Sequence, residues 1–283
     1  MSPGTRLTHR HLTCPVGSYN VLFVGRTDWG TDTELGVGVA KRVAVVVGSN
    51  RPARICPDIA AWLQQELNAA QPSAAWAAQP IRYERVDLAE INLPFLDEPL
   101  IPALGEYAHE HTKAWSRTVS SYDGFVFVFP QYNWGYPAVL KNALDFLFQE
   151  WVGKPATYAT YGTRGGSQAG RQLSGVLAGL HMRELYGHLK IVLTIKDVDS
   201  DWQLKDVDGV LAGYRPQIRR IDAQMREALK VPGRRKTAVT RPIRTAIVAL
   251  RHARVQVTGA IPPARRPRRR PTLASAAAIC VQQ

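Results

Sequence analysis

Two arginines and a serine between a predicted strand and a predicted helix have the charge and the donors that bind an anion. The β-branched residues 42–47 predict the strand, and apolar residues with helical spacing over 55–67 predict the helix. Ser49, Arg51 and Arg54 therefore lie at a helix start, where free backbone N–H groups, the helix dipole and two guanidinium groups favour a phosphate. The alternative is that both arginines are only solvent-exposed side chains at the helix start, with no ligand to bind. The loop lacks the Gly-x-Gly-x-x-Gly and Gly-Lys-Ser/Thr patterns, which argues against a dinucleotide fingerprint and a nucleoside-triphosphate loop.

A second loop, directly after the apolar residues 125–129, has the aromatic side chains that contact a flat ring. Tyr132, Asn133 and Trp134 are suited to lie over or beside an aromatic heterocycle, while backbone groups near Asn133 and Gly135 meet its polar edge. The alternative is that these aromatic side chains only cap the core. The loop leads into a helical pattern, so it is a strand-to-helix loop of the kind that binds ligands in open α/β sheets.

A third loop, residues 162–166, follows a predicted strand at 155–161 and contains three glycines. Closely spaced N–H groups without an obstructing Cβ suit the carbonyl edge of a heterocycle, although Gly-Gly alone is also an ordinary turn. Together, the three loops offer a phosphate site, a ring face and a ring edge. This combination is more informative than any one of the loops.

Strands that alternate with helices must position these loops. Further strands are predicted at 81–87 and 189–195, and further helices at 104–120, 173–180 and 214–229. Such alternation implies parallel pairing with right-handed crossovers. We therefore expect an α/β fold, a flavodoxin-like doubly wound five-stranded parallel sheet in the order 2-1-3-4-5 with helices on both faces.

Charge and composition divide the 283 residues into three parts. Residues 1–40 are expected to be a variable or disordered extension, residues 41–231 the flavodoxin-like domain, and residues 232–283 a basic, disordered tail. From residue 233 onward there are twelve Lys and Arg and no acid, and removing these from the formal net charge of +13 leaves +1. The tail is an alternative contact for nucleic acid or a membrane, but no aromatic residues interleave with its arginines, which favours disorder.

Three scattered cysteines predict neither a disulfide scaffold nor a zinc site, and we expect no metal. The first residues lack the apolar core of a secretory signal, and no run has the ~18 apolar residues of a membrane span. The expected location is therefore cytoplasmic.

Three motifs carry a family resemblance. They are Gly48-Ser49-x-Arg51-Pro52-x-Arg54, Pro130-x-Tyr132-Asn133-x-x-x-Pro137-x-x-Leu140-Lys141-Asn142-Ala143-x-Asp145 and Tyr161-Gly162-x-x-Gly165-Gly166. Over about residues 41–195 the chain closely resembles the NADPH-dependent FMN reductase family, which includes flavodoxin-like quinone, azo and chromate reductases. The resemblance implies an FMN-dependent NAD(P)H oxidoreductase that passes hydride from NADPH or NADH through FMN to a quinone, azo, flavin or metal-ion acceptor. The alternative is a non-enzymatic electron carrier or redox-responsive interaction protein.

The resemblance also implies a cofactor site and an oligomer. Its FMN phosphate contacts are Ser49, Arg51 and Arg54, and its isoalloxazine contacts are Pro130, Gln131, Tyr132, Asn133 and Trp134, with Gly162, Thr163, Arg164, Gly165 and Gly166 along the pyrimidine side. Gln131 departs from the family pattern, because relatives usually have Glu there. Flavin chemistry depends on ring placement, so we expect no catalytic side chain. The implied assembly is a homodimer or homotetramer, and the implied partner is a small-molecule electron acceptor.

Overall fold

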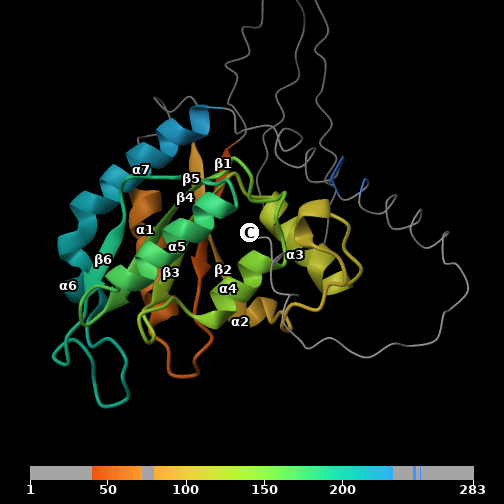
Figure 1. Ribbon diagram of the computed structural model, residues 1–283. Coiled ribbons are helices and arrows are strands. Elements are labelled where there is room, and N and C mark those ends of the chain that lie inside the picture. The colour runs from red at the N-terminus through yellow and green to blue at the C-terminus, as the bar shows by residue number, and fades with distance from the viewer. Residues whose placement is uncertain (1–39, 72–79, 232–244, 247–248, 250–283) are drawn as a thin grey trace, which may run out of the picture. The chain divides into compact units, whose positions relative to one another are not determined.

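The computed structural model describes residues 40–71, 80–231, 245–246 and 249 (Figure 1). The expected N-terminal extension, up to residue 39, lies outside the described residues. The expected basic tail also lies outside them, apart from residues 245–246 and 249.

A parallel β-sheet forms the centre of the described domain. Its strands are β1 (Lys41–Val47), β2 (Ile81–Asp87), β3 (Gly124–Pro130), β4 (Pro155–Gly162), β5 (Arg183–Glu184) and β6 (Leu189–Val192). The order is β2-β1-β3-β4-β5, and β6 also pairs with β4, so the sheet has six strands. The predicted flavodoxin-like order is confirmed, with two short strands at the position expected for the fifth.

The edge strand differs from the prediction in its length and its continuity. Strand β5 pairs with the start of β4, and β6 pairs with the end of β4. The predicted strand at 189–195 ends at Val192, because the backbone N–H and the hydroxyl of Thr194 both donate to the Asp197 carboxylate, at 2.6 and 2.8 Å. This side-chain turn takes the chain away from the sheet.

Helices cover both faces of the sheet (Figure 1). The helical segments are α1 (Cys56–Ala69), α2 (Leu88–Ile91), η1 (Pro102–Leu104), α3 (Glu110–Ser120), α4 (Ala138–Asp145), α5 (Ser167–Gly179), α6 (Val207–Leu211), η2 (Ala212–Tyr214) and α7 (Arg215–Lys230). Helices α1, α6 and α7 pack on one face, whereas α3, α4 and α5 pack on the other. Within the described residues, none of the helices has both the length and the apolar character needed to cross a membrane.

The long helix predicted at 104–120 is instead a short 3-10 turn followed by α3. Gly105 has a φ of 68°, which ends the turn, and the Glu98 carboxylate accepts the backbone N–H groups of Ala108 and His109 at 2.8 and 3.1 Å. These bonds hold the chain in a loop until α3 begins at Glu110.

Burial on two faces explains why the central strands are continuous apolar runs. Alternate residues of β1 and β3 belong to opposite core clusters, so every side chain of the stretch 43–47 and of β3 is buried. Parallel pairing brings the carboxyl ends of β1, β3, β4 and β6 to one edge, with Val47 opposite Val128, Pro130 opposite Tyr161, and Gly162 opposite Val192. The loops that follow these strands therefore meet.

Candidate functional site

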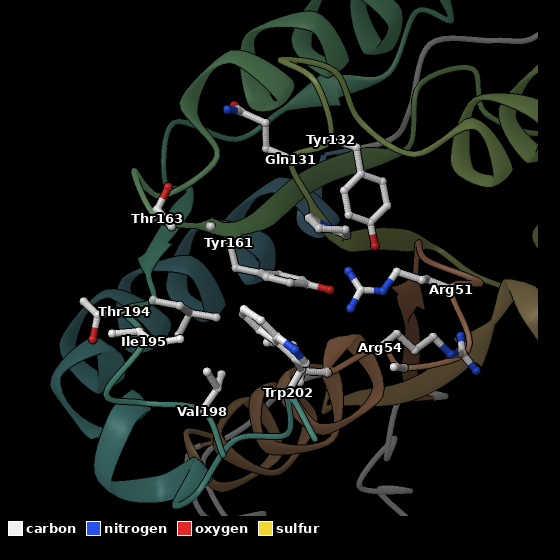
Figure 2. A pocket seen from close by; sticks show the side chains of 15 residues that line it. Arg51, Arg54, Gln131, Tyr132, Tyr161, Thr163, Thr194, Ile195, Val198 and Trp202 are labelled. Atoms are coloured by element: carbon white, nitrogen blue, oxygen red, sulfur yellow. The ribbon is translucent and has the colours of Figure 1, made fainter. Parts of the chain in front are cut away.

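A cavity of about 470 Å³ lies where the loops after β1, β3, β4 and β6 meet (Figure 2). The predicted site residues that line it are Arg51, Arg54, Pro130, Gln131, Tyr132, Gly162 and Thr163. The predicted residues that do not line it are Ser49, Asn133, Trp134, Arg164, Gly165 and Gly166. The volume falls within the range of small-molecule sites.

Arg51 supplies positive charge at this cavity. Its side chain is exposed, and among the described residues no carboxylate pairs with its guanidinium. The adjacent helix α1 has no side-chain cap at its N-terminus, where Ile55 is the capping residue. An uncapped helix start beside a free guanidinium favours an anion.

Arg54 is instead held by protein groups. Its Nη1 and Nη2 atoms lie 2.7 Å from the two carboxylate oxygens of Asp87, and Nη1 also donates to the Ser49 carbonyl. The hydrogen bond to Asp87 is the main reason that the pKa of Arg54 is raised. Arg54 therefore links the β1–α1 loop to the end of β2, and its expected contact with a phosphate stays a prediction.

Ser49 links the first two loops rather than facing the cavity. Its side chain is fully buried, and its hydroxyl lies 3.2 Å from the Tyr132 hydroxyl. This contact positions Tyr132 in the cavity wall.

Residues 132–135 form a tight turn at the start of the β3–α4 loop. The backbone groups of Tyr132 and Gly135 exchange two hydrogen bonds of 2.9 Å. The two central residues, Asn133 and Trp134, have φ angles of 46° and 73°, the left-handed geometry of a type I′ turn. A tryptophan costs about 1–2 kcal/mol in this conformation, and strain of this kind concentrates at functional sites.

Gln131 caps helix α5. Its Oε1 atom accepts the backbone N–H groups of Gln168 and Ala169 at 3.0 and 3.2 Å. The capping position of α5 is Gly166, which has no side chain for this role. Gln131 thus fixes the β4–α5 loop against the β3–α4 loop.

The β4–α5 loop requires glycine at position 166. Gly166 has a φ of 67°, and a Cβ there would lie 2.7 Å from the Cβ of Thr160. The Thr160 hydroxyl donates to the Gly165 carbonyl at 2.5 Å. Gly166 packs against Thr160 of β4 and Gly165 packs against Lys190 of β6, so the expected contact of these glycines with a ring edge stays a prediction.

Sequence reasoning missed the wall of the cavity that follows β6. This wall consists of Leu193, Thr194, Ile195, Val198 and Trp202. The available signal was a tryptophan within a run of turn-forming aspartates, Asp197, Asp199 and Asp201, just beyond an apolar strand.

Cys56 does not provide a reactive thiol. The Cys56 side chain is fully buried, donates to the Val128 carbonyl, and has a pKa raised to about 12 by burial. Its thiol therefore stays protonated and unreactive at neutral pH. In the described part of the chain, no three His, Cys, Asp or Glu side chains are grouped to hold a metal ion.

The sequence matches a family model and curated relatives. The family model described as NADPH-dependent FMN reductase matches residues 41–191. The chain is 45% identical over 152 residues to an NAD(P)H-dependent FMN reductase of Saccharomyces cerevisiae, covering 52% of this chain and 78% of the relative. It is 28% identical over 158 residues to a 2-hydroxy-1,4-benzoquinone reductase of a Burkholderia species, covering 55% of this chain and 75% of the relative.

A solved structure shares the fold. The flavoenzyme NAD(P)H:(acceptor) oxidoreductase FerB of Paracoccus denitrificans superimposes with a TM-score of 0.51 at 20% identity. The match covers 69% of this chain and all of the other.

Proposed function

Since the chain belongs to the NADPH-dependent FMN reductase family and is an FMN-dependent NAD(P)H oxidoreductase, we propose that FMN occupies the cavity at the ends of β1, β3 and β4. Its phosphate lies at the β1–α1 loop, and its ring lies between the β3–α4 and β4–α5 loops. The observation that carries this proposal is the guanidinium of Arg51, which has no carboxylate partner in the described part of the chain and lines the same cavity as Pro130, Tyr132 and Gly162.

The chemistry of the donors supports a phosphate at the first loop. Arg51 has no carboxylate partner among the described residues, and α1 begins without a side-chain cap. Arg54 contributes indirectly, because its bond to the Ser49 carbonyl holds the loop that carries Arg51. The loop therefore has its geometry before the ligand binds.

The rigidity of the other two loops supports a flat ring. The turn at Tyr132 and the cap from Gln131 are both hydrogen-bonded within the protein, so the walls of the cavity are preformed. When bound there, FMN would supply the redox chemistry of electron transfer from NAD(P)H to an acceptor. The protein's own residues bind and orient the ring, and no side chain is required to transfer a proton.

The acceptor is a small molecule, and we infer that it is a quinone-type compound. The benzoquinone reductase among the relatives supports this inference. We also propose that the flavodoxin-like domain spans residues 41–231 and assembles as a homodimer or homotetramer. The scarcity of cysteine supports a cytoplasmic location.

The phosphate site can be tested by comparing FMN with riboflavin, which lacks the phosphate. We expect Arg51→Gln to weaken FMN binding roughly 10- to 100-fold, since hydrogen bonds to charged groups contribute about 1.5–3 kcal/mol, and to affect riboflavin much less. Arg219→Gln, an equal charge change on the exposed face of α7, is the matched control. Binding is measured by quenching of flavin fluorescence.

Equal weakening of both flavins by Arg51→Gln would contradict a phosphate at this loop. If the wild-type protein, mixed with FMN, shows neither bound flavin absorbance near ~450 nm nor NADPH oxidation with ferricyanide, the proposed function itself is wrong.

A further inference from the structure

The chain after β6 forms a small hairpin at the cavity. Val198 and Leu204 pair as an antiparallel bridge. Inside it, the Asp199 carboxylate accepts the backbone N–H groups of Asp201 and Gln203, both at 2.9 Å, and the Asp199 N–H donates to the Gln203 carbonyl. The hairpin, residues 198–204, is therefore internally braced rather than a loose loop.

The base of the hairpin is also fixed. The Asp197 carboxylate accepts both the N–H and the hydroxyl of Thr194, and the Lys205 N–H donates to the Asp197 carbonyl at 3.0 Å. The Tyr214 hydroxyl accepts the Val192 N–H at 3.0 Å, which ties the end of β6 to the helices that follow. The backbone of this segment thus has a defined position beside the cavity.

The segment after β6, residues 193–204, carries large apolar side chains that are exposed rather than packed in the core. Trp202 is 58% exposed and Ile195 is 70% exposed, yet both line the cavity. Trp202 has a φ of 59°, a left-handed conformation that is unfavourable for a tryptophan. Exposed apolar surface and backbone strain at one residue both indicate a functional role.

The apolar wall lies across the cavity from Gln131 and Tyr132 (Figure 2). The loops proposed to hold FMN form the other walls, and the family match ends at residue 191, before this segment begins. The cations at the cavity, Arg51 and Arg54, belong to the β1–α1 loop, and the wall residues after β6 include no charged side chain. A neutral, planar molecule suits this wall better than a phosphate-bearing one.

We propose that Trp202 and Ile195 form a specificity wall that binds the planar aromatic electron acceptor of the reductase. This inference rests on the proposed function, since it places the acceptor beside an FMN held by the opposite loops. A quinone takes two electrons and two protons and leaves as a hydroquinone; NAD(P)H supplies the electrons and one proton, and solvent supplies the other. Ferricyanide is an anion that takes a single electron, so its reduction should not depend on contact with an aromatic wall.

The test compares menadione, a planar naphthoquinone, with ferricyanide in the FMN-loaded full-length protein. We expect Trp202→Ala to lower the ratio of kcat/KM for menadione to kcat/KM for ferricyanide roughly tenfold, because an aromatic contact and its buried area are lost. Trp202→Phe should restore most of the ratio. Tyr186→Ala removes an aromatic side chain that is 97% exposed and does not line the cavity, so it should leave the ratio unchanged.

A binding measurement separates contact with the acceptor from contact with the cofactor. Menadione is titrated into the oxidised, FMN-loaded protein without NADPH, and its Kd is read from the change in the flavin spectrum. We expect Trp202→Ala to raise this Kd about as much as it lowers the activity ratio. Trp202→Ala could instead lower kcat/KM for ferricyanide as much as kcat/KM for menadione, or weaken the binding of FMN and not that of menadione. Either result would show that Trp202 serves the cofactor and would overturn the inference.

The inference and the function on which it rests can fail separately. If the wild-type protein binds no FMN, the proposed function is wrong. If the wild-type protein binds FMN and reduces menadione, but the Trp202→Ala variant keeps the wild-type activity ratio and the wild-type Kd for menadione, only the specificity wall is contradicted.

Discussion

The two arginines of the β1–α1 loop have different environments although they are three residues apart. Arg51 lines the cavity without a carboxylate partner among the described residues, whereas Arg54 makes two hydrogen bonds to Asp87. Asp87 also accepts the Ala89 N–H and so begins α2. Because Asp87 is 33 residues away from Arg54, nothing in the local sequence shows which arginine is neutralised.

Loss of the Asp87 charge should destabilise the fold. The Arg54 and Asp87 side chains are only 17% and 14% exposed, so Asp87→Asn leaves a mostly buried guanidinium without its counter-ion. We expect the free energy of unfolding of the FMN-free protein to fall by about 2–3 kcal/mol, measured by urea denaturation. Asparagine still caps a helix, which limits the change to the ion pair.

The control for this experiment is an exposed ion pair. Asp145→Asn breaks the contact with Lys141, whose side chain is 46% exposed, and should cost less than about 0.5 kcal/mol. Equal losses for the two variants would mean that the Arg54–Asp87 pair has no special structural role.

At the scale of elements, the N-terminus of α5 depends on a side chain from a different loop. Gly166 provides the left-handed turn but no cap, and Gln131 provides the acceptor. The position of the β4–α5 loop is thus coupled to the position of the β3–α4 loop. Only the fold brings these segments together, since the pairing of Pro130 with Tyr161 places Gln131 beside α5.

Substitutions at Gln131 should change stability in opposite directions. We expect Gln131→Ala to lower the free energy of unfolding by about 1 kcal/mol, as for other lost helix caps. Gln131→Glu keeps an acceptor and adds a negative charge at the helix start, which should contribute up to about 1 kcal/mol. Thermal unfolding of the FMN-free proteins gives the comparison, and a Gln131→Glu variant less stable than Gln131→Ala would contradict the capping role.

Local sequence patterns were sufficient to predict the loops after β1, β3 and β4, but they were not sufficient to predict the loop after β6. The β-branched run before Ser49, the aromatic residues after Phe129 and the glycines after Tyr161 each mark a strand end within a few residues. The hairpin that carries Trp202 could not be predicted in this way, because its place at the cavity depends on β6 pairing with β4. The β-branched and apolar residues up to Ile195 continue a strand pattern that the Thr194–Asp197 bonds interrupt.

At the scale of the whole domain, a buried polar network joins segments that are far apart in the sequence. The Asp222 carboxylate on α7 accepts hydrogen bonds from the Tyr83 hydroxyl at 2.9 Å and from Gln71 at 2.6 Å, and it pairs with Arg226 at 2.5 Å. This network connects β2 and the chain after α1 to the last helix. Burial, reinforced by the charge of Asp222, raises the pKa of Tyr83 well above its usual value.

Buried neutral acids of this kind should make the domain unstable in alkali. In the unfolded chain, a thiol ionises near ~8.5 and a phenol near ~10, whereas burial raises the pKa of Cys56 to about 12 and raises that of Tyr83 well above its usual value. Above about pH 8.5 the unfolded state therefore holds fewer protons than the folded state, and the free energy of unfolding falls as the pH rises. Below that pH the contribution is fully present.

Tyr83→Phe isolates one of these groups. The variant loses a hydrogen bond and should be less stable than the wild type at pH 7, but the slope of its unfolding free energy between pH 9.5 and 10.5 should be shallower by about 0.7 kcal/mol per pH unit, because the phenol of the unfolded chain is on average about half ionised in this range. Tyr186→Phe, at a side chain that is 97% exposed, should keep the wild-type slope. Urea denaturation at a series of pH values provides the measurement. A Tyr83→Phe slope equal to that of the wild type would mean that the phenol ionises as readily in the folded protein as in the unfolded chain, and that the Asp222 network does not hold it neutral.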